Sequence, residues 1–152
     1  MIYTKMTCAA ARIAYKAHEG QVDVCGMPYI MHPLHVAEQM QTEEEAAAAL
    51  LHDVIEDTDL TLDDLRTQGI SEEVVEAVDL LTNRGNMSYK DYLLRIKTNP
   101  IALAVKLADV THNMDETRLY GLSEPLDRER SERWHRKYPI AKKLLLGIEE
   151  DD

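Results

Sequence analysis

The stretch TEEEAAAALLHDVIED, residues 42–57, decides the fold. Thr42 and the three glutamates after it are typical of a helix start, because a threonine side chain can cap the first turn and acidic residues there interact favourably with the helix dipole. The run Ala46–Leu51 that follows is entirely apolar, so this part of the helix must be buried. The sequence therefore predicts a central buried helix that continues into the polar residues 52–57.

Helix signals recur on both sides of this stretch. Residues 20–30 contain two glycines and a proline, which favours a loop. Elsewhere Val, Ile and Thr fall at helical rather than alternating spacing, and no strand-turn-strand pattern occurs. We expect helices over 4–18, from Pro33 to about Met40, from Thr61, from Ser71, over 88–97, over 101–114 and over 127–146. The predicted fold is all-α, with one helical bundle domain over residues 1–152.

The composition bounds the possible partners. A chain of 152 residues that is 45% hydrophobic and 30% charged fits one globular domain. Its net charge of −11 disfavours nucleic acid as a partner. The same charge repels small anions, so a phosphorylated ligand would need locally placed cations. The candidates for these cations are Lys106, Arg84, Arg95, Arg118 and the basic residues within 128–137.

Two cysteines, Cys8 and Cys25, occur without the spacing of a metal site, which indicates free thiols in a reducing compartment. The N-terminus lacks a basic stretch followed by an apolar core, and no run approaches the roughly 18 apolar residues of a membrane span. We expect a soluble, unprocessed cytoplasmic protein that binds no membrane. No pattern indicates an oligomeric state.

The strongest chemical signal is the run His52-Asp53-Val54-Ile55-Glu56-Asp57. On a helix, the pairs four residues apart align along one side, so four titratable groups share one stripe. Burying them without a partner would cost several kcal/mol, and a metal ion would remove that cost. Adjacent His and Asp residues are about 100° apart around a helix. They can ligate one ion from two sides, but they leave its coordination shell incomplete.

Other helices must supply the remaining ligands. The best candidates are His32, in the segment YIMHP at the start of the second helix, and Asp109, near the end of the apolar helix IALAVKLAD. Two histidines and two aspartates form a mixed nitrogen and oxygen site, which suits Mn or Fe, with Zn and Mg as alternatives. The predicted metal ligands are His32, His52, Asp53 and Asp109.

Further polar residues lie one helical turn from these ligands. Glu56 and Asp57 are placed to orient a metal-activated water or to move its protons. Asn113 follows Asp109 by four residues and could hydrogen-bond an oxygen of the substrate. The other histidines, His18, His35, His112 and His135, are expected at the surface or in packing roles, and the Met and Tyr residues in the core.

Several motifs occur in one order along most of the chain: AYKAHEGQ (14–21), GMPYIMHPLHVAEQM (26–40), AAAALLHDVIEDTDLTLDDL (46–65), VKLADVTHNM (105–114) and, more faintly, KYPIAKKL (137–144). In these motifs the chain resembles the HD-domain hydrolases of the RelA/SpoT type, including the small stand-alone alarmone hydrolases. The resemblance implies a Mn-dependent hydrolase that removes pyrophosphate from the ribose 3′ position of guanosine tetra- or pentaphosphate. It also implies metal ligation by His32, His52, Asp53 and Asp109, action of Glu56 and Asp57 on the attacking water, and contact of Asn113 with the nucleotide.

The chain departs from the family pattern at four positions. Where these enzymes read GQ-x-R-K-x-G, Asp23 and Val24 replace the basic pair, and Val110 and Glu116 replace the family's Arg and Thr. Fewer cations and an added carboxylate would weaken guanine recognition. The chain ends at Asp152, without room for the synthetase domain of longer members, so alarmone synthesis is not expected.

Three hypotheses remain open from the sequence. The first is an alarmone hydrolase. The second is a hydrolase of another nucleotide or phosphate ester, which the altered positions favour. The third is a non-catalytic binding module with the same fold, against which the presence of Glu56 and Asp57 argues.

Overall fold

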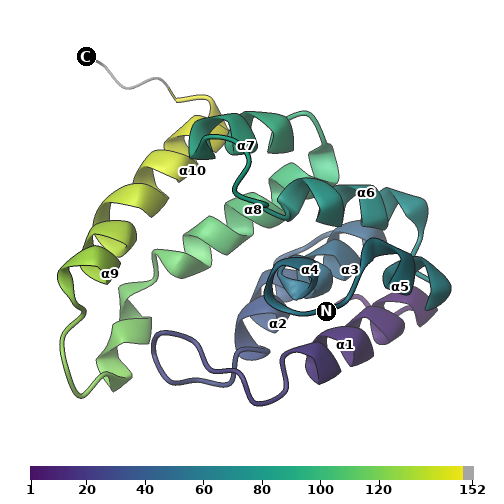
Figure 1. Ribbon diagram of the computed structural model, residues 1–152, viewed down its shortest axis with the longest axis horizontal. Helices are drawn as coiled ribbons and strands as arrows, with labels where there is room; N and C mark the ends of the chain where they lie inside the picture. The colour runs from purple at the N-terminus through teal and green to yellow at the C-terminus, as the bar shows by residue number, and fades with distance from the viewer. Residues whose placement is uncertain (149–152) are drawn as a thin grey trace.

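The computed structural model describes residues 1–148 and is built from helices (Figure 1). In chain order these are α1 (Lys5–Ala17), α2 (Met31–Glu38), α3 (Glu43–Leu51), α4 (Val54–Asp57), α5 (Leu62–Thr67), α6 (Glu72–Leu81), α7 (Tyr89–Ile96), α8 (Pro100–Asn113), the 3₁₀-helix η1 (Glu116–Gly121), α9 (Arg128–Glu132), the π-helix η2 (Arg133–Lys137) and α10 (Tyr138–Leu146). Within this part of the chain no β-strand forms, and one antiparallel bridge joins Val22 to Pro28. The predicted all-α class is confirmed.

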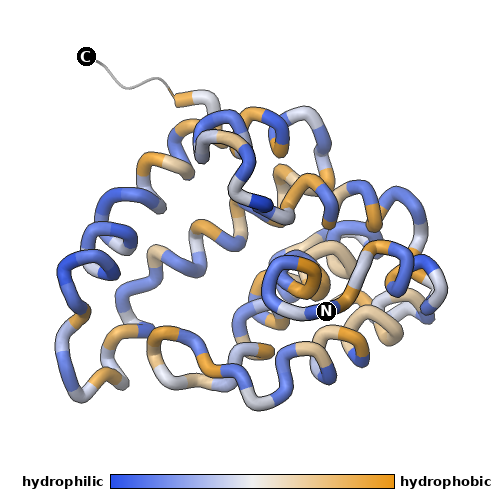
Figure 2. The backbone as a smooth tube through the Cα atoms, viewed as in Figure 1, coloured by the Kyte–Doolittle hydropathy of each residue, from blue (hydrophilic) through white to orange (hydrophobic). Residues whose placement is uncertain are grey.

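Helix α3 lies at the centre of the core. Each residue from Ala46 to Leu51 is at most 1% exposed. Because four of these side chains are only a methyl group, α1, α2, α6 and α8 can all pack closely against this one short helix. Figure 2 shows hydrophobic residues concentrated on α3 and α6, whereas α9 is mostly hydrophilic.

Helix α8 crosses the molecule beside α3 and contacts α2, α3, α6, α7 and α10 (Figure 1). Its start is well defined, because Asn99 accepts a hydrogen bond from Ala102 N at 3.0 Å and Pro100 fits the first helical turn. Val105 and Val110 are fully buried. This packing holds the polar face of α8 in a fixed position opposite the end of α3.

The prediction of one helix through residue 57 was wrong in detail. Helix α3 ends at Leu51 and α4 begins at Val54, because the backbone leaves regular helical geometry at Asp53, whose φ and ψ are −107° and −1°. The carbonyl of Ala49 accepts a 2.6 Å hydrogen bond from the His52 ring instead of continuing a regular helix. The Asp57 N–H still reaches the Asp53 carbonyl at 3.0 Å, so the expected four-residue relationship survives the turn.

The predicted helix over 127–146 is confirmed, with an internal π-helical turn. Asp127 caps α9 by accepting from Arg130 N at 2.9 Å. Pro139 has no N–H to donate to the carbonyl four residues earlier, and the Tyr138 N–H instead reaches the Arg133 carbonyl, five residues back. The turn η1 was not predicted. Among residues 1–148 no helix combines the length and the apolar character needed to cross a membrane.

Candidate metal centre

A cavity of about 630 Å³ lies where the end of α3, the polar face of α8 and the η2 helix meet. The loop between α1 and α2 contributes Val22, Asp23 and Val24 to its lining. The loop over residues 20–30 therefore forms part of the rim. The lining as a whole contains residues from Val22 to Tyr138.

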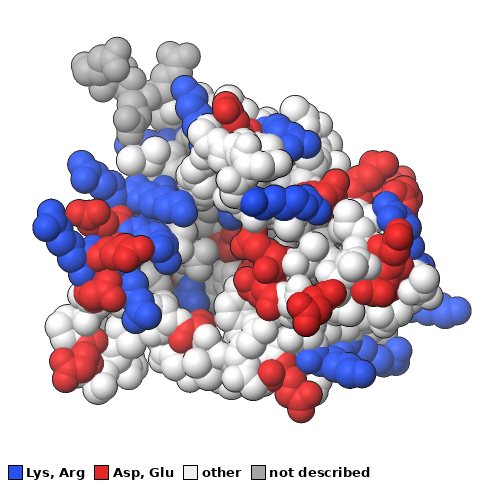
Figure 3. Space-filling model, in the orientation of Figure 1, with Lys and Arg blue, Asp and Glu red and all other residues white. Residues whose placement is uncertain are grey.

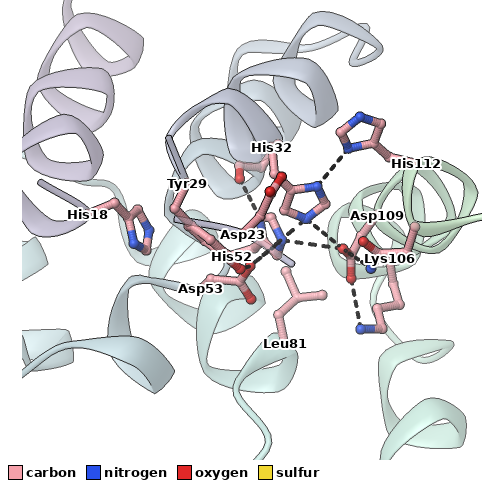
Figure 4. Close-up of polar contacts among 12 residues, drawn as sticks. His18, Asp23, Tyr29, His32, His52, Asp53, Leu81, Lys106, Asp109 and His112 are labelled. Carbon is pink, nitrogen blue, oxygen red and sulfur yellow. Dashed lines mark hydrogen bonds and ion pairs between the residues drawn. The ribbon is translucent and has the colours of Figure 1, made fainter. Parts of the chain in front are cut away.

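The four predicted ligands converge on the lining of this cavity (Figure 4). His32 comes from α2, His52 and Asp53 from the turn between α3 and α4, and Asp109 from α8. His32 Nε2 lies 2.9 Å from Asp109 Oδ1, and His52 Nε2 lies 3.0 Å from Asp53 Oδ2. One ligand atom each from His32, His52 and Asp109 lies within 4.8 Å of the others, and all three residues are buried. This group could hold a divalent metal ion.

The environment of His52 fits a bound cation. Its Nδ1 lies 2.6 Å from the Ala49 carbonyl, which can only accept a hydrogen bond, so Nδ1 carries the hydrogen and the neutral ring has its lone pair on Nε2. That buried Nε2 atom has no hydrogen-bond partner among the described residues, although two carboxylates lie nearby. Burial alone lowers the pKa of His52, but Asp53 and then Asp109 outweigh it and raise this pKa well above its usual value. A metal ion would take the place of that proton.

His32 is oriented by a histidine that the sequence assigned only to packing or the surface. Its Nδ1 lies 2.7 Å from His112 Nδ1. Burial, followed by the charge of Arg118, lowers the pKa of His112 to about 3, so His112 stays neutral. A His112 ring with its hydrogen on Nε2 accepts from His32 Nδ1, and the Asp109 carboxylate, which can only accept, is the partner of His32 Nε2 at 2.9 Å. His112 was missed, although it follows Asp109 by one helical turn.

Both carboxylates have a partner outside the metal group. Lys106 donates to Asp109 Oδ2 at 2.8 Å, and the Tyr29 hydroxyl donates to Asp53 Oδ2 at 2.6 Å. Burial and then Asp53 raise the pKa of Tyr29, so its hydroxyl keeps its proton. Tyr29 was expected in the core with the other tyrosines. Its position three residues before His32 was the available signal for a role at the site.

The three other predicted site residues differ in position, because Glu56 and Asn113 line the cavity and Asp57 does not. Glu56 lines the cavity and accepts a 2.7 Å hydrogen bond from Asn83 N. Asn113 also lines it and donates to Asp109 Oδ1 at 3.2 Å. Asp57 is exposed and is not part of the cavity lining. Burial followed by the charge of Asp53 raises the pKa of Asp57, and burial is also the main cause that raises the pKa of Glu56.

The other histidines occupy places that fit the expectation. His18 is buried and bonds through Nδ1 to Gln21 at 2.9 Å, away from the metal group in Figure 4. His35 stacks on His112 with a centroid distance of 4.0 Å. His135 is exposed and lies 3.3 Å from Glu116.

Five basic residues line the cavity that contains the metal group. The basic residues in the lining are Lys106, Arg118, Arg130, Arg133 and Lys137. Figure 3 shows a hollow on this face, with Lys and Arg gathered among some Asp and Glu on the side of α9 and η2, and with Asp and Glu along the opposite edge. Arg84 and Arg95 lie outside this lining. The acidic chain therefore does place positive charge locally.

The four departures from the family pattern differ in their location. Asp23 and Val24 line the cavity. Val110 is fully buried, and Glu116 pairs with His135. Only the first two can touch a ligand directly.

The curated proteins that are similar to this chain in sequence include the following two. The guanosine-3′,5′-bis(diphosphate) 3′-pyrophosphohydrolase of Haemophilus influenzae is 36% identical over 154 residues, which cover 90% of this chain and 22% of the relative. The bifunctional (p)ppGpp synthase/hydrolase SpoT of Escherichia coli K12 is 35% identical over 133 residues, 78% of this chain and 18% of the relative. The chain thus spans about a fifth of the length of these relatives.

The fold has a solved counterpart. A structure described as a metazoan ortholog of SpoT that hydrolyzes ppGpp matches with a TM-score of 0.74 at 21% identity, and the match covers 96% of this chain and 88% of the other. The family model of the HD domain matches residues 10–134, which include every predicted site residue. By this match, and by the relatives that share its sequence, the chain belongs to the HD-domain family.

Proposed function

We propose that this domain is a metal-dependent phosphohydrolase that removes the 3′-pyrophosphate of guanosine tetra- or pentaphosphate, with Mn²⁺ as its metal. The observation that carries the proposal is the buried group of His32, His52 and Asp109 in a cavity that basic residues also line. A phosphorylated nucleotide could bind the metal group through one phosphate and the basic residues through the others. The names of the curated relatives support the choice of guanosine tetraphosphate.

The residues divide the work of hydrolysis. His32, His52, Asp53 and Asp109 would hold the divalent cation, which supplies Lewis-acid stabilisation of charge on a phosphoryl oxygen. Glu56, which lines the cavity, would accept a proton from the attacking water. The water oxygen would bond to phosphorus as the bond from phosphorus to the ribose 3′ oxygen breaks. The proton that Glu56 accepts balances the one that the 3′ oxygen gains, and pyrophosphate leaves. Asp57, on the exposed side of α4, would exchange protons with the solvent.

The basic residues of α9 and η2 explain how a chain with a net charge of −11 could bind an anionic substrate. Arg130, Arg133 and Lys137 extend from consecutive turns of α9 and η2 into the cavity lining. Lys137 lies 4.3 Å from the centre of the Tyr89 ring, and none of the described carboxylates is within ion-pair distance of it. These cations would hold the phosphate groups that are not attacked.

The deciding experiment measures pyrophosphate release from guanosine tetraphosphate after metal removal with a chelator and readdition of Mn²⁺, Fe²⁺, Zn²⁺ or Mg²⁺. We expect turnover with Mn²⁺ and its loss in Asp53→Ala. Asp59→Ala is the matched control, because Asp59 is exposed and outside the cavity. Absence of turnover with every metal would refute the proposal.

A second candidate is hydrolysis of another nucleotide or phosphate ester. It is favoured by Asp23 and Val24, which put a carboxylate and an apolar side chain on the rim in place of two cations. A panel of GTP, ATP, other guanosine phosphates and nucleoside 3′-phosphates separates the two candidates. Preference for a substrate without guanine would favour the second, and turnover of guanosine tetraphosphate alone would exclude it.

A further inference from the structure

Asp23 and Arg118 form an ion pair across the rim of the cavity. Arg118 NH2 donates to Asp23 Oδ2 at 3.0 Å, and the side chains are only 13% and 9% exposed. The other oxygen, Oδ1, accepts from Cys25 N at 2.8 Å and from Met27 N at 3.0 Å. The Asp23 carboxylate is therefore neutralised and hydrogen-bonded within the protein. It does not act as a free negative charge toward a ligand.

The same guanidinium reaches the end of α8. Arg118 NH1 donates to the His112 carbonyl at 3.1 Å and to Asn113 Oδ1 at 3.2 Å. Its carbon Cζ also lies 5.5 Å from the centre of the Trp134 ring. One side chain thus joins the loop between α1 and α2, the end of α8 and η2.

The contact with Asn113 determines which way its amide points. Arginine has no hydrogen-bond acceptor, so the amide atom that faces it must be the oxygen. The nitrogen then lies on the other side, 3.2 Å from Asp109 Oδ1. Asp109 Oδ1 is also the Asp109 oxygen nearest His32, so a bound metal ion would draw this oxygen away from the Asn113 amide. Arg118 is then the partner that keeps the amide in place.

We propose that Arg118, held by Asp23, is a positioning residue that fixes the Asn113 amide with its NH2 group toward the cavity. One hydrogen of that group points to Asp109, and the second is available to an oxygen of a phosphorylated ligand. This role deepens the proposed function and rests on it for the identity of the ligand. It differs from a role as a phosphate-binding cation, because NH1 of Arg118 already donates to two protein acceptors and NH2 donates to the Asp23 carboxylate.

The test compares Arg118→Gln, Arg118→Lys and the milder Asp23→Asn with Arg66→Gln. Arg66 forms an exposed pair with Glu72 and is the matched control. The first readout is the ¹H–¹⁵N signal of the Asn113 side-chain amide in metal-free protein, assigned by its loss in Asn113→Asp. The second is KM and kcat for guanosine tetraphosphate with Mn²⁺.

We expect the Asn113 signal to shift in all three variants of the pair and to stay unchanged in Arg66→Gln. Loss of a supporting partner typically costs ten- to a hundredfold, and we expect KM to rise about tenfold with a smaller change in kcat. Arg118→Lys should not rescue KM, because a single ammonium cannot reproduce the planar fork. When Asp23 and Arg118 are changed together, the effect on KM should be smaller than the product of the two separate fold-changes.

Several results would overturn the inference. Unchanged Asn113 signals in Arg118→Gln and Asp23→Asn would show that the amide does not depend on the pair. A shifted signal with unchanged KM would show that the amide does not bind the ligand, and full activity of Arg118→Lys would make Arg118 a simple cation. If the wild-type protein hydrolyses no guanosine tetraphosphate, the proposed function fails, and the amide signals still decide whether Arg118 positions Asn113.

Discussion

Lys106 donates a 2.8 Å hydrogen bond to Oδ2 of Asp109 and leaves Oδ1 of the same carboxylate toward the two histidines. Both side chains are largely buried, at 14% and 6% exposure. Burial alone lowers the pKa of Lys106, but the Asp109 carboxylate outweighs it and raises this pKa well above its usual value. Lys106 therefore stays charged, and each oxygen of Asp109 has a separate partner.

Replacement of Lys106 by Met should destabilise the metal-free protein. Removal of one member of a buried ion pair leaves an uncompensated charge and costs about 3 to 5 kcal/mol. Methionine keeps most of the aliphatic stem, so packing changes little. Urea unfolding measures the loss, and added Mn²⁺ should restore part of it, because a cation at Oδ1 supplies the missing charge. Lys90→Met, at an exposed position, is the control. Equal stability of the two variants would contradict this account.

Replacement of Tyr29 by Phe should weaken metal binding without unfolding the domain. The hydroxyl that donates to Asp53 Oδ2 at 2.6 Å is lost, while the ring and its packing remain. Outer-shell partners of metal ligands typically contribute ten- to a hundredfold in affinity. We therefore expect about a tenfold higher Kd for Mn²⁺, measured by calorimetry. Tyr15→Phe changes an exposed ring and should leave the Kd unaltered. An unchanged Kd in Tyr29→Phe would rule out this role of the hydroxyl.

The sequence predicted the fold, and it singled out four polar residues that line one cavity, because both depend on local signals. The run Ala46–Leu51 is apolar on every side, and only a buried helix accommodates it. His52 and Asp53 follow that helix directly, so its burial carries them into the interior. Asp109 is one of the few charged residues of an otherwise apolar helix. In each case the unusual placement of a polar residue in an apolar segment was visible without tertiary structure.

The partners of these residues could not be predicted because they depend on packing between distant segments. Arg118 and Asp23 are 95 positions apart, and either could have faced the solvent. His112 meets His32 only because α2 lies beside α8. The break at His52 was also hidden, since it arises from a side-chain bond to the Ala49 carbonyl rather than from a glycine or proline.

As the pH is lowered, activity should begin to fall at a higher pH than an ordinary carboxylate would cause, because the pKa of Glu56 is raised. Burial is the first cause that raises the pKa of Glu56, and Asp53 adds to it against the lowering effect of the Asn83 hydrogen bond. A general base must be ionised, so kcat/KM should decrease as the pH falls through this raised pKa. The same shift means that the folded state binds the proton more tightly, so its contribution to stability is lost as the pH rises through that range.

Glu56→Gln provides the direct check of this pH dependence. General bases contribute about a hundredfold or more, and we expect a loss of that order together with loss of the acidic limb of the profile. Glu76→Gln, at an exposed position of α6, should keep both the rate and the profile. An acidic limb that persists in Glu56→Gln would assign it to another group.

Trp134 should report ligand binding through its fluorescence, because it is the only tryptophan in the chain and it lines the cavity. Its ring is 5% exposed and lies 5.5 Å from the Arg118 guanidinium, so a phosphorylated ligand would change the charge and the solvent around it. With Mn²⁺ and the slow variant Glu56→Gln, guanosine tetraphosphate should produce a saturable change in emission, which Trp134→Phe abolishes. A saturable change in wild-type protein that shows no turnover would identify a binding module, whereas no change at any concentration would place the nucleotide outside this cavity.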